Sequence, residues 1–147
     1  MSRSIGSSGA NYEHGEDLTI YVFVNEELQM EMGASCAQVA HAVAQMSAKM
    51  PNIVSTTYQA YALHPNRVVV LTAKNSAHLQ NILQYCDETL GIHAEPYIDE
   101  GYECTMTAVA TQPIPKKVGE VFRELWRYGY NTKTKRRPVY PPINWSN

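Results

Sequence analysis

Two short runs of β-branched and aromatic residues, separated by a helical pattern, constrain the fold of this chain most. Residues 18–24 and 67–73 are almost continuously apolar, which is typical of strands buried on both faces. Between them, residues 34–49 are rich in alanine, glutamine and methionine and stop before Pro51, so they are predicted to form a helix packed against a sheet. A strand, a helix and a second strand in this order indicate an α/β fold.

A second helix is predicted directly after the second strand. Asn75 and Ser76 offer an N-cap, and Gly91 ends the pattern just after Leu90. The apolar residues of this segment repeat at helical spacing; they are Leu79, Ile82, Leu83 and Cys86. This spacing predicts that one face of the helix packs on the sheet.

The last elements are two shorter strands and a final helix. Residues 94–98 and 105–111 have strand composition, and the second of these alternates threonine with apolar residues. Pro115 suits the first turn of a helix that is predicted to run to Gly129. Its apolar face would consist of Val118, Val121, Phe122, Leu125 and Trp126.

The order of these elements predicts one domain over residues 18–129, and 147 residues suit a single hydrophobic core. We expect a small mixed sheet of about four strands with helices on both faces. Residues 1–17 form an N-terminal extension, and residues 130–147 form an extended tail rich in basic residues and proline, which suits neither a helix nor a central strand.

The cysteines and the apolar runs exclude several classes of protein. Cys36, Cys86 and Cys104 are widely spaced and include no CxxC pair, so neither a disulfide framework nor a zinc site is indicated. We expect no metal and no other cofactor. The longest apolar runs are far shorter than the roughly 20 residues of a transmembrane helix, so we expect no transmembrane segment. Residues 1–17 carry at best a weak mitochondrial-type signal.

The net charge of −2 hides a strong asymmetry along the chain. Residues 1–115 hold four Lys or Arg against twelve Asp or Glu, a balance of −8, whereas residues 116–147 hold eight against two, a balance of +6. Proteins that bind transfer RNA gain most of their affinity from cations that neutralise phosphates. The negative charge of residues 1–115 therefore argues against transfer RNA as a partner.

Residues 31–42 read Glu-Met-Gly-Ala-Ser-Cys-Ala-Gln-Val-Ala-His-Ala, and residues 98–101 read Ile-Asp-Glu-Gly. The first segment resembles the signature of the archaeal and eukaryotic (type-two) peptidyl-tRNA hydrolases, in which all six residues 37–42 match. The second segment is similar to the Asp-Ala-Gly turn of that family. The order and spacing of the elements over residues 18–129 agree as well, so the resemblance implies the fold of that family.

The departures from the family pattern concern its chemistry. The resemblance implies two lysines before the first helix, which would engage the ester and the phosphates of peptidyl-tRNA, but Met32 and Ala34 stand at these positions. The loop after Gly101 is short, and the family's catalytic-loop threonine has no clear counterpart. Both differences favour a chain that has lost the family's activity.

Three candidate site residues survive at family positions. Gln38 and His41 lie three residues apart, on one face of the helix, where they could hold a water molecule for hydrolysis. The alternative for His41 is a packed residue with one hydrogen bond. Asp99 could act as a general base or orient a histidine, or it could simply form a turn by accepting hydrogen bonds from nearby backbone N–H groups.

A nucleophile is a weaker candidate. Ser35 and Cys36 lie near His41, but activation requires a base within hydrogen-bond reach and a third group that orients it. The sequence locates no such third group.

The basic tail is either a solvated charge run or an arm that binds a partner protein. In the second case aromatic anchors would occupy pockets and the basic run would contact acidic patches. The candidate partner-binding residues are Lys133, Lys135, Arg136, Arg137, Tyr140, Ile143 and Trp145.

We therefore expect a catalytically degenerate hydrolase-fold protein that serves as a structural accessory subunit of a larger protein assembly. The chain resembles hydrolase-like accessory subunits of protist mitochondrial respiratory complex I, which implies a mitochondrial location at the inner membrane. A mitochondrial ribosome is the second candidate assembly, and a cytoplasmic location is the alternative. The alternative functions are an active peptidyl-tRNA hydrolase built on Gln38, His41 and Asp99, and a small RNA- or ubiquitin-pathway binding module that uses the tail.

Overall fold

The strand β1 (Leu18–Asn25) lies inside the sheet, and all eight of its residues are buried, as its continuous apolar run predicted. It pairs in parallel with β2 (Arg67–Ala73) and antiparallel with β4 (Thr105–Thr111). Parallel pairing requires a crossover connection, and a helix provides part of it here. The predicted mixed sheet is therefore confirmed.

The computed structural model describes residues 18–50 and 67–125. The predicted N-terminal extension (residues 1–17), Trp126 and the tail (residues 130–147) lie outside the described residues, as do all the candidate partner-binding residues of the tail. Among the described residues, no helix is long and apolar enough to cross a membrane.

The strand order is β2-β1-β4-β3, with β3 (Ala94–Asp99) antiparallel to β4. A fifth strand of two residues, β5 (Ile114–Pro115), pairs with the start of β1 and is too short to be seen in the sequence. The expectation that residues 67–73 are buried along their whole length was wrong for the first two residues. The strand β2 is an edge of the described sheet, and its first two residues are exposed, because only β1 covers that end.

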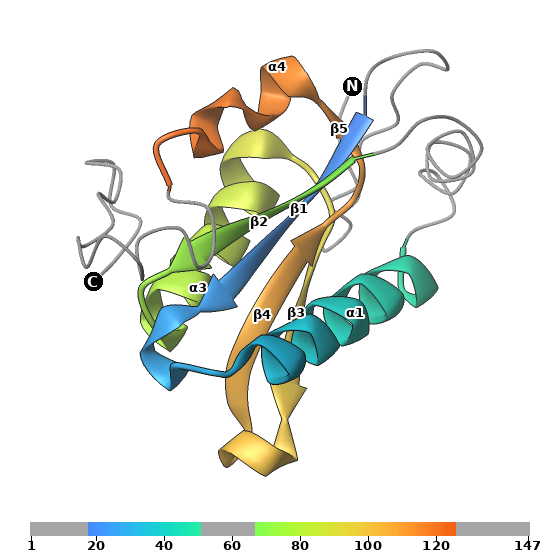
Figure 1. Cartoon of the computed structure of the whole chain (residues 1–147). Helices are drawn as coiled ribbons and strands as arrows, with labels where there is room; N and C mark the ends of the chain where they lie inside the picture. Colours follow the sequence, from blue (N-terminus) through green and yellow to red (C-terminus); the bar gives the residue numbers. More distant parts are fainter. Residues whose placement is uncertain (1–17, 51–66, 126–147) are drawn as a thin grey trace.

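Helices cover both faces of the sheet, as predicted (Figure 1). The helix α1 (Met32–Ala48) covers one face, where Ala42 and Met46 pack against the even-numbered apolar residues of β1. The opposite face carries α3 (Ser76–Tyr85) and the short α4 (Lys116–Gly119). The two apolar layers lie on either side of β1, which is why both of its faces are buried.

The second predicted helix has the expected ends. The Asn75 side chain accepts a hydrogen bond from the backbone N–H of His78, which caps α3. The helix continues as the π-helical segment η2 (Cys86–Leu90) and ends at Gly91, whose φ of 67° places it in the left-handed region.

The final helix is shorter than predicted, although its apolar face is correct. After α4 the chain forms a 3-10 turn, η4 (Glu120–Phe122), and the described part ends at Leu125. Phe122 and Leu125 are buried as expected, and the Phe122 ring packs 4.9 Å from the ring of Phe23. Gly119 weakens helix propagation in the middle of this segment, so the apolar contacts are made by tight turns instead.

Candidate functional site

An irregularity in the pairing of β3 with β4 shapes the candidate site. Tyr97 pairs with Ala108, but the next residue, Ile98, pairs with Met106, so Thr107 is an extra residue on β4. Such a β-bulge turns the side chain of the inserted residue away from its regular direction. Thr107 consequently faces α1 together with Ala108.

Thr107, Gln38 and Asp99 form a chain of hydrogen bonds between the sheet and α1. The Thr107 hydroxyl donates to Gln38 Oε1 at 2.6 Å, and Gln38 Nε2 donates to Asp99 Oδ2 at 2.8 Å. Gln38 is 4% exposed and Thr107 is fully buried, so both ends of the amide are held in place. Because Gln38 Oε1 accepts the hydrogen bond from the Thr107 hydroxyl, the N–H₂ group of the same amide faces the Asp99 carboxylate.

The second oxygen of Asp99 has a turn-forming role. Asp99 precedes the 3-10 segment η3 (Glu100–Tyr102), and its Oδ1 accepts a hydrogen bond from Gly101 N–H at 2.8 Å. The predicted turn role is therefore confirmed, and the bond to Gln38 is added to it. The Gln38 amide, the Gly101 N–H and the nearby His41 hold the pKa of Asp99 below its usual value.

His41 does not share the environment of Gln38. It is exposed, and its ring centroid lies 5.0 Å from that of Tyr97, with the rings tilted by 41°. The expectation of a packed histidine is wrong, because position 41 of α1 lies at the outer border of the contact with β3. The structure thus places the amide of Gln38 in the interior and the imidazole of His41 at the surface.

The two positions where the resemblance implies lysines lie on the first turn of α1. Met32 is 82% exposed and Ala34 is half-buried. Among the described residues, no lysine or arginine contributes to the lowered pKa of Asp99. The ionised Asp99 carboxylate is therefore stabilised by hydrogen bonds from neutral donors and, more weakly, by the charge of His41.

The neighbouring Ser35 and Cys36 do not form a nucleophile with a base. The Ser35 hydroxyl donates to the carbonyl of Glu31 at 3.0 Å, within the first turn of α1. Cys36 is exposed on the next position. Within the part of the chain that the structure describes, no three His, Cys, Asp or Glu side chains are grouped to hold a metal ion.

The sequence did not identify Thr107 or Tyr97 as site residues. Regular alternation along residues 105–111 assigns Thr107 to the face opposite α1. Its contact with Gln38 depends on the β-bulge, and no residue in this segment predicts a bulge. Tyr97 is an aromatic residue in a strand, which is common, so its residue type alone did not indicate a site. The arrangement as a whole can present an ionised carboxylate as a hydrogen-bond acceptor at the surface beside α1.

Comparisons with known proteins agree with the architecture around this site. The family model described as "Peptidyl-tRNA hydrolase PTH2" matches residues 18–127, which is well over half of the chain and includes every element described above. A search of curated proteins found no match to the chain.

Proposed function

Because this chain belongs to the peptidyl-tRNA hydrolase PTH2 family, we propose that it keeps the family fold without the family's activity and serves as a structural accessory subunit of a larger assembly. One observation carries the proposal. The two lysine positions that the resemblance implies are occupied by Met32 and Ala34.

The charges around the site support this proposal. Glu31 precedes α1, and Glu100 and Glu103 belong to the turn that follows Asp99; all three are exposed. These carboxylates would repel the phosphates of a bound transfer RNA, because exposed charges closer than the Debye length of about 8 Å at physiological salt are only partly screened. A site that cleaves peptidyl-tRNA needs positive charge to bind these phosphates.

We propose mitochondrial respiratory complex I, at the inner membrane, as the first candidate for the assembly, and the mitochondrial ribosome as the second. The support for this location is the resemblance of the sequence to hydrolase-like accessory subunits of that complex. Other protein subunits would be the partners.

Two measurements test the proposal. Purified protein should release no peptide from peptidyl-tRNA above the rate without protein, and the endogenous protein should migrate with other subunits in native electrophoresis of detergent-solubilised mitochondria. Migration as a free protein of 16.5 kDa would contradict the accessory role, whatever the outcome of the hydrolysis assay.

The second candidate is an active peptidyl-tRNA hydrolase, and the contact between Gln38 and Asp99 favours it. In this case Asp99 would orient a water molecule that attacks the ester, with His41 beside it. Peptide release that is abolished by Asp99→Asn, but kept in the matched surface variant Glu103→Gln, would establish this function. The proposal of an inactive subunit would then be wrong.

A further inference from the structure

The outer edge of β3 has an open backbone position at Ala94. The carbonyl of His93 accepts from Gln112 N–H, and His93 N–H donates to Gln112 Oε1, both at 2.8 Å, so the peptide groups of His93 face β4. Successive residues of a strand direct these groups to opposite sides, so the N–H and C=O of Ala94 point to the free edge. Within residues 18–50 and 67–125, no strand pairs with that edge.

The next outward-facing residue is already blocked. Pro96 has no N–H, and its carbonyl accepts a hydrogen bond from Gln45 Nε2 at 2.7 Å. Proline on an edge strand limits pairing with another strand. Any strand that is added here must therefore be short and centred on Ala94.

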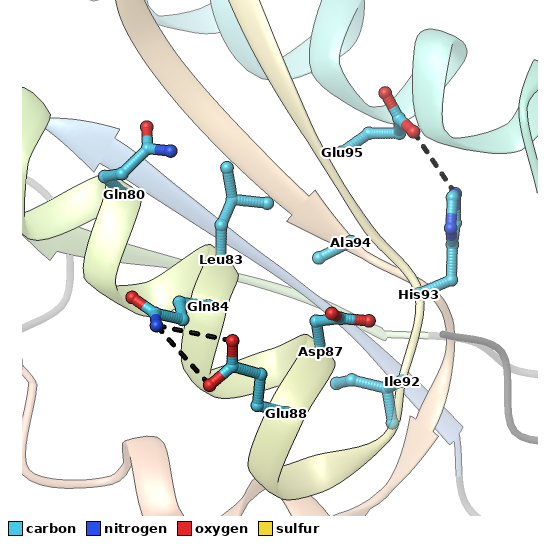
Figure 2. A pocket seen from close by; sticks show the side chains of 9 residues that line it. All are labelled: Gln80, Leu83, Gln84, Asp87, Glu88, Ile92, His93, Ala94 and Glu95. Atoms are coloured by element: carbon cyan, nitrogen blue, oxygen red, sulfur yellow. Dashed lines mark hydrogen bonds and ion pairs between the residues drawn. The ribbon is translucent and has the colours of Figure 1, made fainter. Parts of the chain in front are cut away.

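A hollow of about 400 Å³ lies beside Ala94, between β3 and the helical segments α3 and η2 (Figure 2). Its lining combines apolar side chains with amides and carboxylates. The lining residues are Gln80, Leu83, Gln84, Asp87, Glu88, Ile92, His93, Ala94 and Glu95. The hollow thus has room for an extended backbone beside a mainly polar lining that includes three carboxylates.

Carboxylates lie on both sides of this edge. Asp87 and Glu88 lie on η2, and both are exposed; among the described residues, no lysine or arginine forms an ion pair with either. Glu95 lies towards α1, where Lys49 Nζ is 3.8 Å and His93 Nε2 is 3.7 Å from it. An occupant with basic side chains on both faces would match this arrangement.

The composition of the chain indicates which segment fits. Three segments lie outside the described residues. Residues 1–17 hold one Arg against three acidic residues, and residues 51–66 hold no Lys, Arg, Asp or Glu. Residues 126–147 hold five Lys or Arg and no acidic residue. Charge therefore selects the C-terminal segment among the three.

We propose that residues 133–137 of the same chain add to the edge of β3 as a short strand, paired with the peptide groups of Ala94. Side chains of a strand alternate, so Lys133, Lys135 and Arg137 would face one side of the edge and Arg136 the other, and each side carries a carboxylate. Pro138 lacks an N–H and would end the pairing.

The chain length allows this placement. Leu125 belongs to the same apolar cluster as Ile92, which lines the hollow. Seven residues separate Leu125 from Lys133, and in extended form they span up to about 25 Å, more than the length of a ten-residue helix such as α3. A tethered segment of this length has an effective concentration of about a millimolar. The proposal does not depend on the accessory role or on the assembly.

The test uses the full-length protein, labelled with ¹⁵N, and the exchange rate of the Ala94 amide. If the tail pairs with Ala94, the variant Lys135→Glu/Arg136→Glu/Arg137→Glu should exchange this amide about tenfold faster than the wild type. The matched control Lys116→Glu/Lys117→Glu changes exposed charges on α4 and should leave the rate unchanged. Adding Asp87→Lys/Glu88→Lys to the triple variant should restore slow exchange.

Two results would overturn the proposal. An Ala94 amide that exchanges equally fast in the wild type and the triple variant would show that the tail does not pair there. Protection that falls on tenfold dilution would show that the occupant is a second copy of the chain instead of its own tail. A tail that binds only acidic patches of another protein would give the first of these results.

Discussion

Thr107 donates a hydrogen bond of 2.6 Å to Gln38 because β4 contains one residue more than β3 opposite Tyr97. Val109 packs in the apolar layer of α3, so regular alternation would direct Thr107 to that layer as well. The bulge instead directs Thr107 towards α1, and Met106 before it packs in the α3 layer. The position of Asp99 beside α1 thus depends on a local irregularity of the sheet.

Removing this hydroxyl should destabilise the domain. In Thr107→Val the volume is kept, but Gln38 Oε1 remains buried without its donor, so we expect the free energy of unfolding to fall by about 1–3 kcal/mol. Urea denaturation measures this change. Thr107→Ser keeps the donor and should lose clearly less; a loss in Thr107→Ser as large as that in Thr107→Val would show that the hydroxyl contributes no more than the methyl group.

The ionisation of Asp99 should depend on Gln38 more than on His41. The hydrogen bond from Gln38 is the first cause of the lowered pKa, and the charge of His41 is a weaker one. In Gln38→Leu the pKa of Asp99 should therefore rise towards its usual value, and in His41→Gln it should rise less. Titration of the Asp99 carboxyl carbon by NMR measures both.

The lowered pKa of Asp99 also determines how the stability of the folded state changes with pH. The ionised carboxylate stabilises the folded state at pH values above the unfolded pKa, and this contribution is lost as the pH falls through the folded pKa. The stability difference between the wild type and Gln38→Leu should accordingly shrink in acid. A difference that stays constant with pH would mean that Gln38 does not act through the Asp99 charge.

The strands, the first two helices and the turn at Asp99 could be predicted because local patterns determine them. The apolar run of β1 and the Asn75 cap of α3 are visible in the sequence, and both were confirmed. The site was predicted only in part. Gln38 and Asp99 were named separately, but their contact spans 61 residues and relies on the bulge at Thr107. Long-range pairing of this kind leaves no trace in local spacing.

His78 should make the domain sensitive to acid. Burial lowers its pKa from 6.5 to about 4, and the charge of Lys74 adds to this; its Nδ1 accepts a hydrogen bond from Lys74 N–H. The neutral imidazole stabilises the folded state fully above pH 6.5, and this contribution is lost as the pH falls towards 4. Relative to His78→Gln, the wild type should lose up to about 2–3 kcal/mol over this range. Parallel stability curves for the two proteins would contradict the assignment.

Gly119 should not tolerate a side chain. A Cβ atom at this position would overlap the ring of Tyr21, which is buried against α4 and contacts Phe122. Gly119→Ala should therefore lower the free energy of unfolding by about 1–3 kcal/mol, since the ring and the backbone must move apart. Gly33 is the matched control, because no atom lies within 4 Å of its added Cβ. Gly33→Ala, inside α1, should raise the stability by about 0.5–1 kcal/mol.

The turn between β3 and β4 should become more stable when its strain is relieved. Glu103 and Cys104 both have φ of 58°, a conformation that costs side-chain-bearing residues about 1–2 kcal/mol each. Cys104 is exposed, so its side chain offers little packing in return. In Cys104→Gly the relief exceeds the entropy that glycine adds to the unfolded chain, and we expect a gain of about 0.5–1 kcal/mol. The same substitution in α1, Cys36→Gly, should have the opposite sign, with a loss of about 1 kcal/mol, because helical glycine is unfavourable. A loss in both variants, measured by thermal unfolding, would show that the left-handed turn at Cys104 does not form in solution.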